Sequence, residues 1–354
     1  MRAYLVTGGA GFIGSNYIRY MLGKYHDIRI VNLDALTYAG NLENLADVES
    51  NGNYTFERGD IGDSALTQRL FKEYDFDYVI NFAAESHVDR SIWEPELFAK
   101  VNVLGALNLM NTAMNAWKTG DDTYRDGVKF VQISTDEVYG ALGKEGLFTE
   151  TTPLCPHSPY AASKTSAQMF AKAYFDTYRF PVNITCCSNN YGPYQFPEKL
   201  IPLMINNALH HKALPVYGDG LQVRDWLYVE DHCRAIDLVT REGRLGEVYN
   251  VGGRNEKYNI DIVKTIIAYI QEQVDSTVDE QLIRYVTDRK GHDRRYAIDP
   301  GKIQTELGFW PETAFEDGIR KTIEWYLDNK GWTERVTSGA YQNYYKRLYE
   351  NRGA

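Results

Sequence analysis

The sequence predicts an α/β fold, a Rossmann-type doubly wound parallel sheet with a smaller, loop-rich C-terminal substrate domain. Short apolar segments alternate with helical segments through the first half of the chain, a pattern typical of parallel sheets with right-handed crossovers. A glycine-rich turn follows the first apolar segment. Beyond residue 190 the segments become shorter and richer in Gly and Pro, as in PYQFPEKLIP and LPVYGDG, which indicates a second, smaller unit.

The main sheet is expected from six apolar runs and a helical repeat. Ile18, Met21, Leu22 and Tyr25 recur at helical spacing after the first run, so we expect a helix that begins near Ser15. The strands are predicted at AYLVT (3–7), IRIVNL (28–33), YTFE (54–57), YVINF (78–82), KFVQIS (129–134) and VNITCC (182–187).

The change in segment length and in Gly and Pro content near Asn189 divides the chain. We predict a cofactor domain over residues 1–188, a substrate domain over 189–335 and a C-terminal extension over 336–354. The run EVYNVGG (247–253) indicates one more strand, so residues 236–256 could return to the main sheet. The extension is rich in aromatic residues, namely Tyr341, Tyr344, Tyr345 and Tyr349.

Charge and composition exclude several classes of function. The 354 residues include 48 acidic and 38 basic side chains, for a net charge of −10, which disfavours a general binder of nucleic acid or of anionic membranes. A local basic pocket could still hold a small anion. The sequence has no apolar run of about 18 residues and no signal-peptide pattern, so we expect a cytoplasmic protein with no membrane partner.

The four cysteines follow no metal or disulfide pattern. Cys155, Cys186, Cys187 and Cys233 contain no C-x-x-C pair, and Cys186 and Cys187 lie within an apolar run. We therefore expect free, buried thiols and no metal site.

The turn TGGAGFIG predicts a dinucleotide site. Gly8, Gly11 and Gly14 stand between a strand and a helix, where backbone N–H groups and the positive helix end can meet a pyrophosphate. A simple tight turn is the alternative, but Asp34 ends the second strand, where a carboxylate accepts from the adenosine ribose. Ala35, not Arg, follows, which favours NAD over NADP. Further candidates at strand ends are Asp60, Ile61, Phe82, Ala83 and Ala84.

The run SPYAASK places a tyrosine and a lysine one helical turn apart. Ser158 can cap a helix and Pro159 suits its first position, so Tyr160 and Lys164 share a face. A lysine ammonium and a nicotinamide charge can stabilise a tyrosine phenolate and make it a usable base. The same spacing occurs by chance on many amphipathic helices, but here it follows a dinucleotide motif and Thr135.

The run ISTDEVYG sets Asp136 beside Glu137 where an apolar strand ends. A solvated acidic turn is one interpretation. The other is an acid and a base, because burial and mutual repulsion can keep one carboxyl group protonated while its neighbour is ionised.

These motifs together resemble the extended short-chain dehydrogenase/reductase superfamily, in its nucleotide-sugar branch, and within it the dTDP-glucose 4,6-dehydratases. The resemblance covers about residues 3 to 330, and Asp136-Glu137 is its most specific part, since sugar epimerases of the superfamily usually carry small or hydroxyl residues there. Lys290 stands where the family often has proline. The matching runs are DALTYAGN (34–41), FAAESHVDRS (82–91), STDEVYG (134–140), SPYAASK (158–164), CSNNYGPYQFPEKLIP (187–202), VYGDGLQVRDWLYVEDH (216–232) and GHDRRYAID (291–299).

The resemblance implies a redox-neutral dehydration of dTDP-glucose to a 4-keto-6-deoxy sugar. Tyr160 would deprotonate the 4-hydroxyl with help from Thr135, while NAD takes a hydride from carbon 4. Glu137 would take the carbon-5 proton, and protonated Asp136 would donate to the leaving 6-hydroxyl, before hydride returns to carbon 6. Oxidation must come first, because the carbon-5 proton is too weakly acidic without a neighbouring ketone.

The resemblance also implies two sets of binding residues. Lys199 and Arg224 would face the diphosphate, although solvated surface charge is the commoner role of a lysine. His87 is interpreted as a positioned histidine. The cofactor set is Gly8, Gly11, Phe12, Ile13, Gly14, Asp34, Ala35, Leu36, Thr37, Asp60, Ile61, Phe82, Ala83, Ala84, Ser86, Val101, Tyr160, Lys164 and Asn190. The substrate set is Ser86, His87, Thr135, Asn189, Lys199, Leu200, Pro215, Val216, Tyr217, Arg224, Asn259, His292, Arg295 and Tyr296.

Three alternatives remain open from the sequence. The enzyme could prefer UDP- or CDP-glucose, or it could be a nucleotide-sugar 4-epimerase, which needs no Asp-Glu pair. A non-catalytic dinucleotide-binding regulator would gain nothing from the Thr, Asp-Glu, Tyr and Lys set. Segments 96–117 and 167–178 carry more apolar positions than one core-facing stripe needs, so we expect a homodimer.

Overall fold

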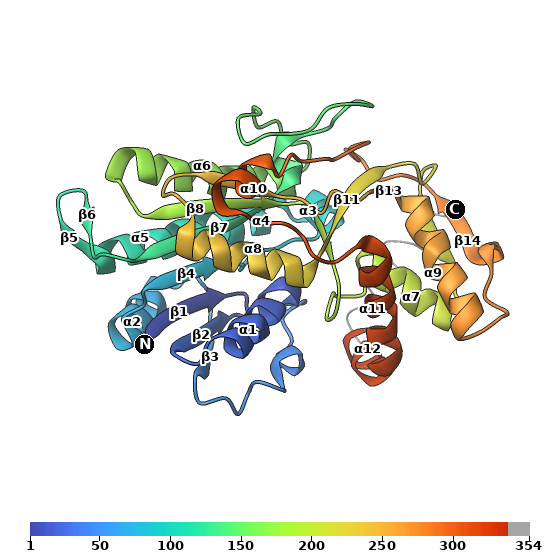
Figure 1. Ribbon diagram of the computed structural model, residues 1–354, viewed down its shortest axis with the longest axis horizontal. Helices are drawn as coiled ribbons and strands as arrows, with labels where there is room; N and C mark the ends of the chain where they lie inside the picture. The colour runs from blue at the N-terminus through green and yellow to red at the C-terminus, as the bar shows by residue number, and fades with distance from the viewer. Residues whose placement is uncertain (339–354) are drawn as a thin grey trace.

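A seven-stranded parallel sheet forms the centre of the computed structural model, which describes residues 1–338 (Figure 1). The strand order is β12-β8-β7-β4-β1-β2-β3, and each neighbouring pair is parallel. The strands are β1 Arg2–Thr7, β2 Ile28–Asp34, β3 Tyr54–Arg58, β4 Tyr78–Asn81, β7 Lys129–Thr135, β8 Val182–Cys187 and β12 Val248–Val251. The predicted sheet is confirmed, and the run EVYNVGG returns to it beside β8.

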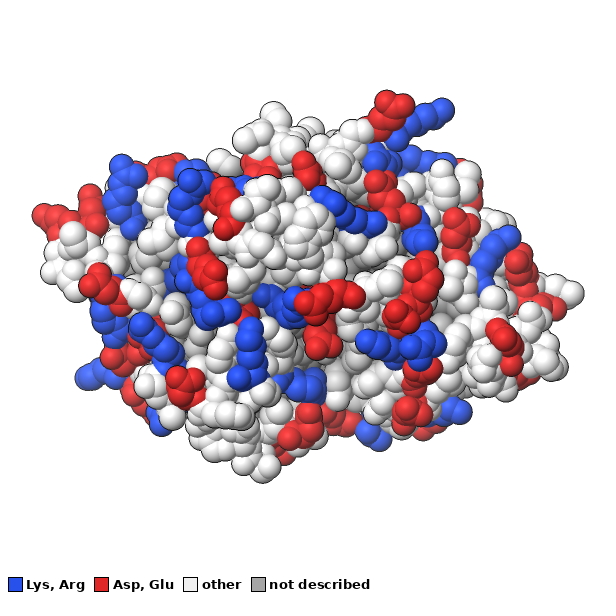
Figure 2. Space-filling view, in the orientation of Figure 1, with Lys and Arg blue, Asp and Glu red and all other residues white. Residues whose placement is uncertain are grey.

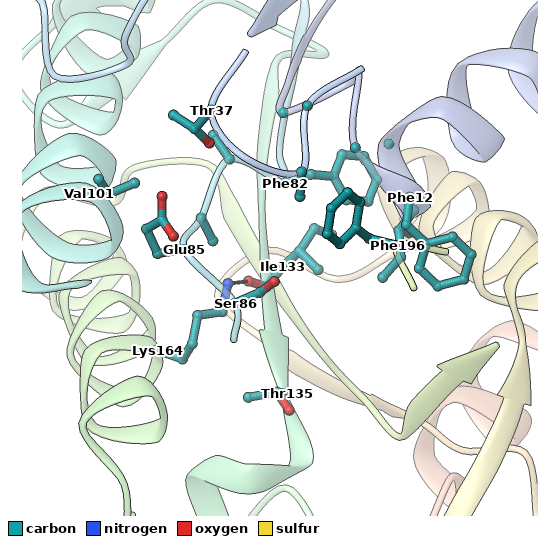
Figure 3. Close-up of a pocket in the computed structure, with 18 of the residues that line it drawn as sticks. Phe12, Thr37, Phe82, Glu85, Ser86, Val101, Ile133, Thr135, Lys164 and Phe196 are labelled. Carbon is teal, nitrogen blue, oxygen red and sulfur yellow. Dashed lines mark hydrogen bonds between the residues drawn. The ribbon is translucent and has the colours of Figure 1, made fainter. Parts of the chain in front are cut away.

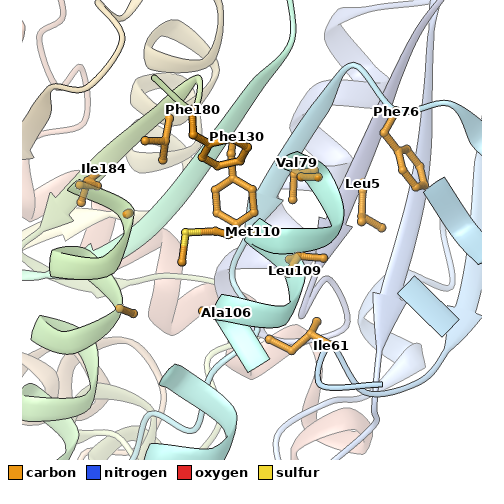
Figure 4. Close-up of a cluster of buried hydrophobic side chains, with 14 of the residues drawn as sticks. Leu5, Ile61, Phe76, Val79, Ala106, Leu109, Met110, Phe130, Phe180 and Ile184 are labelled. Atoms are coloured by element: carbon orange, nitrogen blue, oxygen red, sulfur yellow. The ribbon is translucent and has the colours of Figure 1, made fainter. Parts of the chain in front are cut away.

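Helices cover both faces of this sheet, so consecutive strand residues are buried in opposite cores. Leu5 of β1 packs with Leu109 and Met110 of α5 on one face (Figure 4). The next residue, Val6, packs with Ile18 of α1 on the other. This is why the central predicted strands are continuous apolar runs and do not alternate, whereas β3, at the sheet edge, is only half-buried. The main covering helices are α1 Phe12–Lys24, α2 Ser64–Tyr74, α5 Ala106–Trp117, α6 Pro159–Tyr178 and α8 Val229–Glu242.

The strand order reverses at β1, because β2 lies on one side of it and β4 on the other. Open parallel sheets bind ligands at the carboxyl ends of the strands beside such a reversal. The glycine turn lies there. Helix α1 begins at Phe12 and not near Ser15, because Gly11 already serves as its N-cap; the apolar repeat marked only the core-facing residues.

A smaller unit lies beside the carboxyl edge of the main sheet (Figure 1). It contains a three-stranded sheet in the order β13-β11-β9 and a parallel pair, β10 and β14. Its elements are β9 Asn189–Tyr191, β10 Leu214–Tyr217, β11 Val223–Tyr228, β13 Glu256–Tyr258, β14 Ile283–Val286, α7 Leu200–Leu209, α9 Asn259–Gln273, α11 Phe315–Asp328 and α12 Lys330–Val336. The division at 1–188, 189–335 and 336–354 stays a prediction, and Tyr341, Tyr344, Tyr345 and Tyr349 lie outside the described residues.

Short elements complete the chain. They are η1 Leu42–Leu45, α3 Val88–Trp93, α4 Pro95–Phe98, the π-helical η2 Ala99–Gly105, β5 Lys118–Gly120, β6 Thr123–Tyr124, η3 Asp136–Tyr139, η4 Glu280–Leu282 and α10 Gly301–Leu307. Among residues 1–338, no helix has the length and apolarity needed to cross a membrane. Figure 2 shows acidic and basic side chains interspersed over one face of the molecule.

The cysteine prediction is wrong at one position. All four thiols are free, and Cys186, Cys187 and Cys233 are buried as expected. Cys155 is exposed, because it lies in the loop that follows β7 and not in a strand. Within residues 1–338, no cluster of His, Cys, Asp or Glu side chains is suited to hold a metal.

Candidate active site

A cleft opens at the carboxyl ends of the central strands and receives side chains from both parts of the chain (Figure 3). Phe12, Phe82 and Phe196 form one apolar wall, and Val101 lies on the opposite side. Lys164 reaches from α6 toward the strand that carries Ile133 and Thr135. The cleft therefore joins the glycine turn to the predicted catalytic residues.

The glycine turn fits closely against the neighbouring strand end. Gly8 has a φ of +68°, a region that favours glycine, and a Cβ there would lie 2.7 Å from the backbone nitrogen of Ala83. A Cβ on Gly14 would lie 2.4 Å from the Gly8 carbonyl oxygen. No side chain caps the N-terminus of α1, so its first N–H groups remain available to an anion.

Asp34 ends β2 and lines the same cleft. Its carboxylate accepts hydrogen bonds from the backbone N–H of Ala10 (2.9 Å) and of Leu36 (2.8 Å). These bonds tie the glycine turn to the end of β2. Burial raises the pKa of Asp34, and the two backbone donors oppose that rise.

Helix α6 begins as the sequence predicts. Ser158 caps it by accepting from the Ala161 N–H at 3.1 Å, and Pro159 is its first residue. Lys164 donates to the Ile133 carbonyl at 2.6 Å, and burial lowers its pKa to about 8. Burial, followed by the charge of Glu137, raises the pKa of Tyr160 well above its ordinary value. Lys164 is thus fixed at the strand end within the cleft that Tyr160 also lines.

The acidic pair follows directly on β7. Thr135 caps η3 by accepting from the Glu137 N–H at 3.3 Å, and its hydroxyl donates to Asp136 Oδ1 at 3.2 Å. Asp136 Oδ2 is buried and has no hydrogen-bond partner among the described residues. Burial, then the charge of Glu137, raises the pKa of Asp136 well above its ordinary value. The interpretation as a solvated acidic turn is wrong, because Asp136 is 1% exposed.

Glu137 lies where the two parts of the chain meet. Burial raises its pKa, whereas the positive charges of Arg289, Arg224 and Lys199 lower it. Lys199 donates to the Ser86 carbonyl at 3.0 Å. Arg224 donates to the Asp293 carbonyl at 2.9 Å and lies over the Tyr296 ring. The predicted diphosphate residues therefore belong to a basic group that faces the acidic pair.

The cleft collects most of the predicted residues. All five predicted catalytic residues line it, as do Ser86, Asn189 and Lys199 of the substrate set. Leu36 of the cofactor set does not line it. The remaining cofactor residues that do are Gly8, Gly11, Phe12, Ile13, Gly14, Asp34, Ala35, Thr37, Asp60, Ile61, Phe82, Ala83, Ala84, Val101 and Asn190.

The other predicted substrate residues lie outside the cleft lining, on elements of the smaller unit or next to it. Tyr217 ends β10, and its ring lies 6.0 Å from that of His292. Arg295 is held by the Glu256 carboxylate through two hydrogen bonds of 2.7 and 2.9 Å. The full group is His87, Leu200, Pro215, Val216, Tyr217, Arg224, Asn259, His292, Arg295 and Tyr296.

His87 holds its own loop in place. Its Nδ1 accepts from the Arg90 N–H at 3.4 Å and caps α3. Its Nε2 lies 3.9 Å from the Glu198 carboxylate. This environment agrees with the interpretation as a positioned histidine.

Several residues of the site were not predicted. Tyr38, Glu85, Gln195 and Glu198 line the cleft, and the Tyr38 hydroxyl donates to Glu198 at 2.9 Å. Burial raises the pKa of Glu198 to about 7. Tyr38, Gln195 and Glu198 stand inside the runs DALTYAGN and CSNNYGPYQFPEKLIP. The match of these runs to the dehydratases was the signal that could have identified the three residues. Arg289, which acts on Glu137, stands beside the run GHDRRYAID and carried no signal of its own.

Known proteins are similar to this chain over nearly its whole length. Residues 5–322 match the family described as GDP-mannose 4,6 dehydratase. A dTDP-glucose 4,6-dehydratase of Xanthomonas campestris pv. campestris (strain B100) is 54% identical over 345 residues, 97% of this chain and 98% of that protein.

Two crystal structures are similar in sequence and in fold. The dTDP-glucose 4,6-dehydratase of Bacillus anthracis str. Ames, in complex with NAD, is 48% identical with a TM-score of 0.86, covering 95% of this chain and 100% of that one. The enzyme of the same name from Streptomyces venezuelae, also with NAD bound, is 46% identical with a TM-score of 0.87, covering 94% and 99%.

Proposed function

This chain belongs to the GDP-mannose 4,6 dehydratase family, and from that premise we propose that it is an NAD-dependent lyase that dehydrates dTDP-glucose to dTDP-4-keto-6-deoxyglucose. One observation carries the proposal: buried Asp136 and half-buried Glu137 share a single cleft with the glycine turn and Tyr160. An epimerase would use the turn and Tyr160 but would have no task for two adjacent carboxyl groups in the cleft. The relatives named above support dTDP-glucose as the substrate.

The cleft fits NAD. The close approach of Gly8 and Gly14 to neighbouring backbone leaves the uncapped end of α1 open to a pyrophosphate. Asp34 stands at the end of β2, where the ribose hydroxyls of NAD bind. When bound, NAD supplies the hydride acceptor for carbon 4 of the sugar and the hydride donor for carbon 6. Ala35, in place of a basic residue, fits NAD better than NADP.

Tyr160 removes the proton of the sugar 4-hydroxyl in this scheme, and Thr135 orients that hydroxyl. The buried phenol needs positive charge nearby to ionise, because burial and Glu137 both raise its pKa. Lys164 supplies such charge from a fixed position against the Ile133 carbonyl. Its lowered pKa, about 8, means that it also accepts and releases protons near neutral pH.

Glu137 and Asp136 perform the elimination. The surrounding cations oppose the rise that burial causes in the pKa of Glu137. In this scheme its carboxylate takes the carbon-5 proton, which the carbon-4 ketone has made acidic. Asp136 is kept protonated by burial and by its neighbour, and it donates to the departing 6-hydroxyl. Its buried Oδ2, which has no hydrogen-bond partner within residues 1–338, is the atom available to do so.

The nucleotide diphosphate lies against the smaller unit in this proposal. Lys199 and Arg224 face it, joined by Arg289, whose buried Nε has no hydrogen-bond partner among the described residues. Asn259 Oδ1 is also buried, and it too lacks a hydrogen-bond partner in residues 1–338. We assign the remaining predicted residues Leu200, Pro215, Val216, Tyr217, His292, Arg295 and Tyr296 to the nucleoside and sugar contacts.

We also propose a homodimer. Leu104 of η2 and Met169 of α6 are 61% and 51% exposed, and Phe170 of α6 is exposed as well. Elements η2 and α6 pack against each other, so these apolar side chains belong to neighbouring surfaces. A second copy of the chain would cover them.

Product analysis tests the function directly. Purified protein is incubated with dTDP-glucose, UDP-glucose and CDP-glucose, and a 4-keto-6-deoxy product is detected by its absorbance in alkali. We expect that product from dTDP-glucose, with kcat/KM more than about threefold above the other two, or ~0.7 kcal/mol. A 4-epimer without alkali-dependent absorbance would refute the dehydratase, and equal kcat/KM values would refute selection of the base.

A further inference from the structure

An exposed cysteine, an exposed histidine and a buried aspartate lie in consecutive contact next to the smaller unit. Cys155 Sγ lies 3.8 Å from His157 Nε2. His157 Nδ1 lies 2.5 Å from Asp293 Oδ1. Asp293 is 7% exposed, and its other oxygen accepts from the Tyr296 hydroxyl. Neither Cys155 nor His157 has a part in the dehydration described above.

This order of groups is the one that activates a nucleophile. The Asp293 carboxylate can only accept, so Nδ1 of His157 donates its proton to it, and the lone pair of Nε2 faces the thiol. Nε2 can then take the thiol proton, and the buried carboxylate stabilises the imidazolium that forms. A nucleophile, a base and a group that orients the base are the parts required.

We propose that Cys155 is a reactive thiol, activated by His157 and Asp293, that exchanges with low-molecular-weight disulfides such as oxidised glutathione. The Cys155 thiolate attacks one sulfur of the disulfide while His157 holds the proton. A protein–glutathione disulfide forms, the glutathione disulfide bond breaks, and the departing thiolate takes the proton from His157. The disulfide is the oxidant, and one molecule of reduced glutathione is released for each adduct.

Accessibility distinguishes Cys155 from the other thiols. Cys155 is exposed, and the side chain of His157 is 43% exposed, so a peptide disulfide can reach both. Cys186, Cys187 and Cys233 are buried, and burial raises their pKa values, that of Cys186 to about 12. Those three thiols serve as unreactive references within the same molecule.

An adduct at Cys155 would reach the dehydratase site through two contacts. The Cys155 N–H donates to the Val138 carbonyl at 3.0 Å, one residue beyond Glu137. Asp293, which holds His157, also holds the Tyr296 hydroxyl, and its carbonyl accepts from Arg224. Displacement of the imidazole by a glutathionyl group would therefore disturb the segment that carries Arg289 and the Asp293 carbonyl that accepts from Arg224.

The test measures adduct formation by mass spectrometry on the full-length protein incubated with oxidised glutathione, and iodoacetamide alkylation in parallel. We expect a single glutathione at Cys155, reversed by dithiothreitol, and none in Cys155→Ser. His157→Ala should slow both reactions at least about tenfold. The matched control is His211→Ala, which removes another exposed histidine paired with an aspartate, His211 and Asp275 at 3.1 Å, and should change neither rate.

Two results would overturn the proposal: equal rates in wild type and His157→Ala, or preferential labelling of a buried cysteine. Should His157→Ala fail to fold, the wild-type protein still decides, because Cys155 must alkylate faster than free glutathione at the same pH. Turnover is followed in the same samples and should fall as the adduct forms. That readout rests on the proposed function, whereas the mass readout does not, so failure of one is distinguishable from failure of the other.

Discussion

Asp136 and Glu137 are adjacent in η3, yet the charges around the two carboxyl groups differ. Burial and the charge of Glu137 both act to keep Asp136 protonated. Burial also raises the pKa of Glu137, but three cations, Arg289, Arg224 and Lys199, act against it. This difference in surroundings is what the proposed mechanism uses to give two neighbouring carboxyl groups the roles of acid and base. The asymmetry comes from the smaller unit, which supplies every one of those cations.

Glu137→Gln should block the step that follows oxidation. The amide keeps the shape of the side chain but cannot take a proton, so turnover should fall about 10²-fold or more. Carbon 4 should still be oxidised, and reduced NAD should be detectable by its absorbance. Deuterium from solvent should not enter carbon 5 of the sugar, as followed by mass spectrometry. Normal deuterium exchange in this variant would show that another base acts.

Asp136→Asn should slow the loss of the hydroxyl and leave oxidation intact. Removal of the proton donor should slow elimination about 10²-fold, so that reduced NAD accumulates within a single turnover. Stopped-flow absorbance measures that accumulation. Carbon-5 exchange should persist, in contrast to Glu137→Gln. If neither variant formed reduced NAD, the acidic pair would only organise Thr135 and Tyr160.

The same Asp136→Asn variant should be more stable than wild type at high pH. The pKa of Asp136 is raised in the folded state, so its contribution to stability is present at low pH and is lost as pH rises through the folded pKa. The amide does not titrate. We expect a higher Tm for the variant than for wild type at about pH 8, and a difference in Tm that shrinks toward about pH 4. The difference in free energy of unfolding at high pH should be ~1.4 kcal/mol for each unit by which the pKa of Asp136 is raised. A constant difference across that range would refute the buried, protonated state.

Glutamate substitutions at the exposed apolar surface should dissociate the proposed dimer. Leu104→Glu and Met169→Glu place charges where a partner would exclude water, at a cost of several kcal/mol. The molar mass measured by light scattering should fall from about twice the 40.5 kDa of one chain to the mass of one chain. Trp310→Glu is the control, because Trp310 is also exposed, 53%, but lies after α10. A wild-type mass of one chain at micromolar concentration would refute the dimer outright.

The sequence predicted features that depend on local patterns. Every predicted strand of the main sheet is present, because a strand covered by helices on both faces must be a continuous apolar run. The glycine turn, Asp34 and the cap at Ser158 follow from neighbours in sequence. The start of α1 at Phe12 was missed because its first turn faces the cleft and carries no apolar repeat. Arg289 and Asp293 were missed for another reason: their effects on Glu137 and His157 arise only when distant segments pack together.

The glycine turn offers the sharpest test of cofactor binding. Gly8→Ala should cost both stability and bound NAD, because its φ of +68° disfavours a side chain and the new Cβ would lie 2.7 Å from the Ala83 nitrogen. We expect a loss of 1–3 kcal/mol, about the usual cost of such strain. NAD released by acid from the purified protein should fall from near one per chain to well under half.

Gly23→Ala is the matched control in the helix that follows the turn. Gly23 lies in α1, and a Cβ there would have nothing within 4 Å, so the substitution should raise stability by about 0.5–1 kcal/mol through helix propensity. Its NAD content should equal that of wild type. If Gly8→Ala kept full NAD while losing stability, the turn would be structural and the cofactor would bind elsewhere. NADP in the acid extract of wild type would instead refute the interpretation of Asp34 and Ala35.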